Sequence, residues 1–135
     1  MRNPERKIIV AVALLLVFLA ASLSEARDFR VRKRVGNFIV DATLDKNPPV
    51  LGNCDIRIEI RDGQGAAVTG SRVTVNYYMP PMPGMVPMNY TIQATPRGSS
   101  HVASMNFIMT GPWNIVIHFT AGGRSWNITF PIDVR

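Results

Sequence analysis

The chain has 135 residues and a formal net charge of +6, with 47% hydrophobic and 18% charged residues. This length allows one domain with short appendages. The single cysteine excludes an intrachain disulfide, and the sequence contains no metal-hydrolase helix motif, nucleophile elbow or phosphate-cradling loop, so we do not expect an enzyme.

The N-terminus predicts export from the cytoplasm. Basic residues precede an uncharged apolar run at residues 8–23, and the small-x-small pattern Ser24-Glu25-Ala26 follows it, as at a signal-peptidase site. The run is shorter than the roughly 20 residues that a spanning helix needs. Residues 1–26 are therefore predicted to be a signal peptide, with an uncleaved anchor in the cytoplasmic membrane as the alternative. In both cases the rest of the chain is expected to be periplasmic or otherwise extracytoplasmic.

Residues 27–36 form a basic segment that allows two interpretations of its role. On a strand, Arg30, Arg32 and Arg34 would share one face. This pattern predicts a linker or a charged edge strand that resists aggregation. The alternative is proximity to a membrane, with Arg30, Arg32, Lys33 and Arg34 in contact with anionic lipid headgroups. A nucleic-acid partner is not expected, because the exported domain carries no recognition motif.

The remaining chain is predicted to be a sandwich of short strands. Strands are expected at residues 38–44, 54–60, 73–77, 90–95, 102–109, 113–121 and 124–134. Helical periodicity is missing from this part. About seven strands at short spacing predict an all-β, immunoglobulin-like antiparallel β-sandwich. Cys54 shares an alternating face with three isoleucines, so we expect a buried, inert side chain. An intermolecular disulfide or a metal thiolate is the alternative.

A proline-rich stretch carries a methionine at every third position: Met79, Met82, Met85 and Met88. Proline disfavours a helix or a central strand here, and polyproline II would place all four thioethers along one edge. A thioether is a soft ligand that suits Cu(I), and outside the cytoplasm it forms no disulfide. Because one polyproline turn rises about 9 Å, successive thioethers on a straight segment would barely converge on one ion, but Gly84 could bend the segment and bring Met82 and Met85 together.

Further donors could complete such a site. Met105 and Met109 lie on one face of the strand that follows, and His101 lies at its start on the same alternating face. A site of methionine, or of methionine and histidine, would favour Cu(I) over Zn(II). The alternative is that methionine and proline form an adaptable apolar surface that docks on a partner or simply packs.

Several short motifs together resemble the YtkA-like family of small exported bacterial domains, with its FixH-like relatives. The resemblance covers residues 37–134. It is carried by Gly52-Asn53 before an alternating strand, the turn Asp62-Gly63-Gln64-Gly65 with residues 68–73 after it, Met79-Pro80-Pro81-Met82, and Gly111-Pro112-Trp113 before a Val/Ile-rich strand.

The resemblance implies an immunoglobulin-like domain, here residues 37–135, on the outer side of the cytoplasmic membrane. It also implies copper handling, because FixH-like proteins accompany copper-transporting pumps and oxidase assembly. By this resemblance Met79 and Met82 are the motif methionines, whereas Val86 and Asn89 stand where many relatives have a histidine.

Two functions follow as expectations. The first is a non-catalytic module that binds Cu(I) or another soft metal through the methionine loop and serves a copper transporter, an efflux system or an oxidase-assembly complex. The second is a metal-free module that docks on a membrane complex through the same loop.

Overall fold

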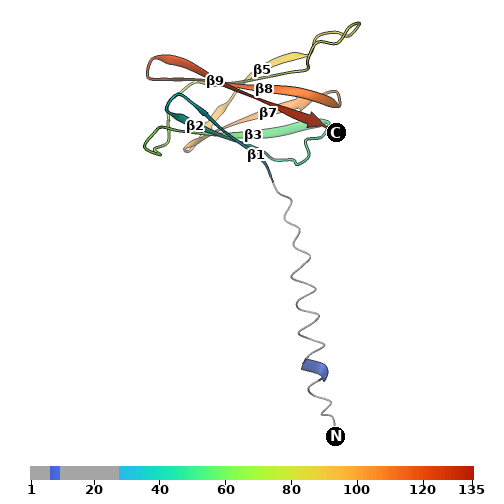
Figure 1. Cartoon of the computed structure of the whole chain (residues 1–135), viewed down its shortest axis with the longest axis horizontal. Coiled ribbons are helices and arrows are strands. Elements are labelled where there is room, and N and C mark those ends of the chain that lie inside the picture. Colours follow the sequence, from blue (N-terminus) through green and yellow to red (C-terminus); the bar gives the residue numbers. More distant parts are fainter. Residues whose placement is uncertain (1–6, 10–27) are drawn as a thin grey trace.

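The computed structural model describes residues 7–9 and 28–135 (Figure 1). Strict alternation of apolar and polar side chains produces strands with one buried and one exposed face, as in Cys54–Ile60 of β3. Over the described residues the strands are β1 (Phe29–Val35), β2 (Phe38–Leu44), β3 (Gly52–Arg61), β4 (Val73–Tyr78), β5 (Asn89–Gln93), β6 (Thr95–Arg97), β7 (Ser100–Phe107), β8 (Gly111–Ala121) and β9 (Arg124–Val134).

The strands form two packed antiparallel sheets. One has the order β1-β2-β3-β7-β6, and the other has the order β5-β4-β8-β9. The inward faces of both sheets make one apolar core, whose largest fully buried side chains include Trp113, Phe107 and Phe119. This arrangement confirms the all-β, antiparallel prediction and places the polar faces outward.

The prediction of about seven strands was wrong, because the described part of the chain has nine. The basic segment forms β1, an edge strand paired along its length with β2. The single strand expected at residues 90–95 is two strands in different sheets. They separate at Ala94, which is buried and donates its backbone N–H to the Val73 carbonyl at 2.9 Å. The chain therefore crosses from one sheet to the other at this corner.

The predicted signal peptide or anchor at residues 1–26 falls outside the described residues, apart from a helical stretch at residues 7–9. In the described part of the chain, no helix combines the length and the apolar character that crossing a membrane requires.

Four segments lie at one end of the sandwich, called here the methionine end. They are the connections at residues 45–51, 79–88 and 108–110, together with the C-terminal Arg135. Pairing of Gly52 with Phe107 places the first and third connections side by side, and the Leu51 N–H donates to the Arg135 carbonyl at 3.2 Å. Figure 1 shows the yellow-green 79–88 loop reaching beyond the strands at this end.

Candidate metal site

The methionine stretch is the hairpin loop between β4 and β5. The Met79 N–H donates to the Met88 carbonyl at 3.0 Å and closes the base of the loop. At its tip, the Met85 N–H donates to the Met82 carbonyl at 3.2 Å, and Gly84 has φ of 78°. Proline followed by a glycine with positive φ is the pattern of a type II turn. Gly84 therefore bends the segment, as the sequence predicted.

The bend gathers the four methionines around one small hollow. Its volume is about 10 Å³, which is close to the space that one water molecule occupies. The lining is Met79, Pro80, Pro81, Met82, Met85, Val86, Pro87 and Met88. Thioether sulfur is the only soft donor among these lining side chains.

The four methionines differ in how firmly they are held. Met79 is buried and belongs to the core, and Met88 is half-buried and packs against the core. Met82 and Met85 are each 41% exposed at the tip of the loop. Two thioethers are thus fixed by packing, and two face the solvent, where an incoming ion would meet them first.

The strands that carry the loop are braced by polar and aromatic contacts. The side-chain amide of Asn76 donates to the Asn89 side-chain oxygen at 2.5 Å and to the Tyr90 carbonyl at 3.0 Å. Tyr77 packs against Tyr90 and Trp113, with ring centroids 5.3 and 5.9 Å away. Sequence reasoning missed these supports, because their contacts depend on strand register rather than on spacing along the chain.

The other three candidate ligands do not line the hollow. Met109 lies at the same end, half-buried against the core, and its carbonyl accepts a hydrogen bond from Trp113 Nε1 at 3.0 Å. Met105 is fully buried in the core and pairs with Cys54 across β3 and β7. The structure therefore gathers the loop methionines without Met105 and Met109.

His101 lies toward the opposite end of β7, where it pairs with Ile58 and Pro96. Phe107 is six positions further along the same strand, which corresponds to about 20 Å. The side chain is only 4% exposed, and its Nε2 has no hydrogen-bond partner among the residues that the structure describes. His101 therefore belongs to the core and is distant from the methionine loop.

Cys54 does not provide a ready metal thiolate. Burial, reinforced by a hydrogen bond to Asp45 and the charge of that residue, raises the pKa of the thiol to about 12. The thiol is thus protonated at neutral pH, whereas metal binding needs the thiolate. Within residues 7–9 and 28–135, no three His, Cys, Asp or Glu side chains are grouped so that they could hold a metal ion. A metal site in this part of the chain would have to rely on thioethers.

Comparison with known proteins identifies one family. The model of the family described as YtkA-like matches residues 34–118, which is more than half of the chain. The match runs from the end of β1 into β8 and includes the whole methionine loop. No curated protein and no solved structure matches the chain.

Proposed function

The chain belongs to the YtkA-like family, and we propose that its domain is an extracytoplasmic, non-catalytic module that binds Cu(I) through Met79, Met82, Met85 and Met88. One observation carries this proposal: a single hollow of about 10 Å³ is lined by all four methionines of one loop. Neutral thioethers hold a soft monovalent ion without releasing protons.

The difference in burial suggests how such a module would exchange its ion. Met79 and Met88 are held by the core, so they would keep their positions during exchange. Met82 and Met85 lie at the exposed tip, so they are accessible to the donor groups of a partner. We propose that the partner is a membrane-bound copper transporter, an efflux component or an oxidase-assembly complex, which would take the ion by ligand exchange at the tip.

A metal-free docking role is the second candidate, and a specific observation favours it. The methionine end exposes Val86 at 82%, Ile108 at 57% and Leu51 at 51%. Exposed apolar side chains grouped at one end of a domain are typical of a protein-binding surface. The loop would then act as an adaptable apolar contact on a membrane complex.

Titration with Cu(I) against a chromophoric chelator separates the two functions. The full chain is compared with a variant in which all four loop methionines are changed to Leu, which preserves size and apolarity but removes the donor. The copper function predicts one bound ion in the wild type and at least a hundredfold weaker binding in the variant.

A matched control is Met109→Leu, since Met109 lies at the same end but does not line the hollow. It should bind Cu(I) like the wild type, and circular dichroism should show the same fold for all three proteins. Equal copper binding by the wild type and the four-Leu variant, or none by either, would leave the docking function as the explanation of the loop.

A further inference from the structure

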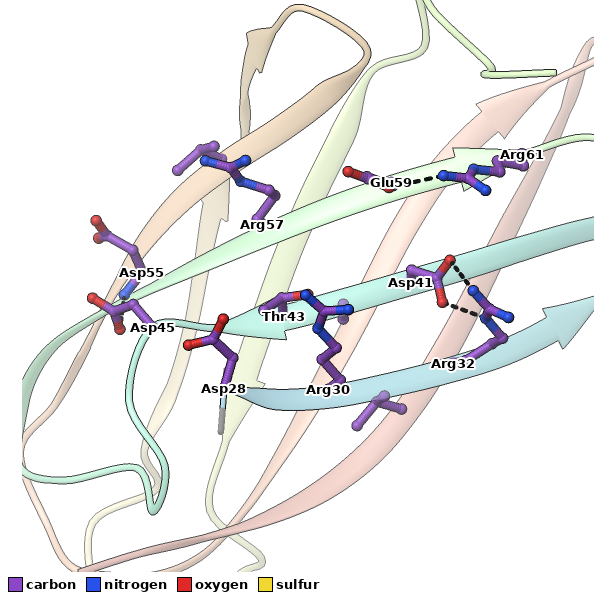
Figure 2. A pocket seen from close by; sticks show the side chains of 13 residues that line it. Asp28, Arg30, Arg32, Asp41, Thr43, Asp45, Asp55, Arg57, Glu59 and Arg61 are labelled. Carbon is purple, nitrogen blue, oxygen red and sulfur yellow. Dashed lines mark hydrogen bonds and ion pairs between the residues drawn. The ribbon is translucent and has the colours of Figure 1, made fainter. Parts of the chain in front are cut away.

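A second hollow lies on the outer face of the five-stranded sheet, and none of the loop methionines lines it. It is a polar trough of about 770 Å³ across β1, β2, β3 and one residue of β7, shown in Figure 2. The volume is within the range of small-molecule sites. Its charged lining residues are Asp28, Arg30, Arg32, Asp41, Asp45, Asp55, Arg57, Glu59 and Arg61.

The arginines of the trough fall into two kinds. Arg32 donates two hydrogen bonds to the Asp41 carboxylate, at 2.6 and 3.1 Å, and this contact raises its pKa. Arg61 pairs with Glu59 at 3.4 Å. By contrast, Arg30 and Arg57 have no ion pair or hydrogen-bond partner among the described residues. Two guanidinium groups in the trough are thus available to a ligand.

The two available arginines belong to one cross-strand row. Arg30 pairs with Thr43 across β1 and β2, and Thr43 pairs with Arg57 across β2 and β3. Two strand spacings, about 9.6 Å, therefore separate the arginine backbones, with the Thr43 hydroxyl between them. Figure 2 shows all three side chains on the same face of the sheet. Guanidinium groups on both sides of a hydroxyl suit a phosphate group, which accepts several charge-assisted hydrogen bonds.

A row of carboxylates lies beside the arginine row. The Asp55 N–H donates to the Asp45 side chain at 3.0 Å, and Asp28 precedes the first residue of β1. Along the strands these residues are two positions from the arginine row, or about 7 Å. Figure 2 shows Asp28, Asp45 and Asp55 together at that side of the trough. Each carboxylate can accept further hydrogen bonds, and an ammonium group offers three donors.

We infer that the trough binds a small zwitterion that carries a phosphate and, a few bonds away, a primary ammonium group. Arg30, Thr43 and Arg57 would take the phosphate, and Asp28, Asp45 and Asp55 would take the ammonium. The neighbouring row of opposite charge disfavours a simple anion as well as a simple cation. Ethanolamine phosphate has this chemistry, either as a soluble compound or as the headgroup of phosphatidylethanolamine.

Titration calorimetry on the full chain in a non-ionic detergent tests the inference, with ethanolamine phosphate, choline phosphate and inorganic phosphate as the probes. Ethanolamine phosphate should bind at least fivefold more tightly than the other two probes. The quaternary ammonium group of choline phosphate has no N–H donor, and inorganic phosphate has no ammonium group at all. Arg30→Gln and Arg57→Gln should each weaken its binding by about five- to tenfold.

The Asp28→Asn variant gives the sharper result. It should weaken binding of ethanolamine phosphate and strengthen binding of inorganic phosphate, because one repulsive carboxylate is removed. Arg34→Gln is the matched control, since Arg34 is an exposed arginine of β1 that does not line the trough. Equal affinity for the three probes, or arginine variants that bind like the control, would overturn the inference.

A second experiment distinguishes a lipid headgroup from a soluble compound as the source of the ligand. The full chain is placed in phosphatidylcholine nanodiscs with or without phosphatidylethanolamine, and the ethanolamine phosphate titration is repeated. A lower apparent affinity only in the discs that contain phosphatidylethanolamine assigns the ligand to the lipid headgroup. The same affinity in both kinds of disc assigns it to a soluble compound.

Discussion

Met79 and Gly111 pack so closely that a Cβ added to the glycine would lie 3.1 Å from the Met79 Cε. Gly111 also has φ of 119°, a backbone conformation that side chains with a Cβ rarely adopt. Gly111, the first residue of β8, is thus in close contact with the buried side chain of Met79. This contact links the folding of the sandwich to the position of one proposed ligand.

Gly111→Ala should therefore affect both stability and copper binding. The strained backbone and the tight contact should lower the free energy of unfolding by about 1–3 kcal/mol, as measured by chemical denaturation. Movement of Met79 should weaken Cu(I) binding as well. Gly52→Ala is the control, because Gly52 has φ of 96° but nothing within 4 Å of its added Cβ. It should lose stability and retain copper affinity. Equal copper affinities of the two variants would contradict this role of Met79.

The unequal burial of the methionines gives a second prediction. Met82→Leu with Met85→Leu should change the free energy of unfolding by less than about 0.5 kcal/mol, because both side chains are well exposed. Met79→Ala should lower it by about 2–4 kcal/mol, because it leaves a cavity in the core. Denaturation curves of the two variants provide the comparison. A large loss of stability in the double variant would show that the tip packs more firmly than its exposure indicates.

Oxidation mapping tests the same arrangement without mutation. Dilute peroxide should convert Met82 and Met85 to sulfoxide well before buried Met79 and Met105, and mass spectrometry reads each site. Ag(I), a soft monovalent ion that peroxide does not oxidise as it does Cu(I), should slow oxidation of the tip methionines. Half-buried Met109 serves as the internal control, and its oxidation rate should not change with Ag(I). Equal protection of Met109 would mean that the metal binds outside the hollow.

His101 offers a prediction about stability alone. Its buried Nε2 has no hydrogen-bond partner in the described part of the chain, and an unsatisfied buried polar atom costs about 1–3 kcal/mol. His101→Leu should therefore leave the free energy of unfolding unchanged or raise it by about 1 kcal/mol, and Cu(I) affinity should stay at the wild-type value. A loss of both stability and copper binding in this variant would show that the histidine acts on the loop.

Much of the sandwich could be predicted from alternation within single strands. In β3 and β9 the pattern of every second apolar residue identified the buried faces. The same reasoning put His101, Met105 and Phe107 on one face correctly. It could not tell that this face points into the core, because that depends on the packing of the second sheet.

Structural features that depend on contacts between residues distant in the sequence could not be predicted from the sequence. The break at Ala94 reflects a change of sheet, and no local signal separates it from a continuous strand. Arg30 and Arg57 lie in one cross-strand row only because β1 and β3 both pair with β2 in a fixed register around Thr43. For the methionine loop, by contrast, Gly84 was sufficient to predict a bend, because turn chemistry is local.

The buried thiol of Cys54 gives a prediction for alkaline pH. Its pKa is about 12 in the folded protein and 9.0 is the ordinary value, so above pH 9 the unfolded chain loses this proton while the folded chain keeps it. The unfolded state then binds fewer protons, and stability falls as pH rises from about 9 towards 12. Chemical denaturation of the wild type and Cys54→Ala, followed over this range, isolates the effect from other titrating groups.

The alanine variant should be less stable than the wild type at pH 7, because a small cavity replaces the sulfur. The difference between the two proteins should shrink as pH rises, since only the wild type carries the thiol. The native wild type should also react slowly with iodoacetamide at pH 8, whereas the denatured chain should react fast. A stability difference that is constant from pH 8 to 11, together with fast alkylation of the native protein, would show that the thiol ionises as it does in the unfolded chain. Cys54 would then again be a candidate metal thiolate.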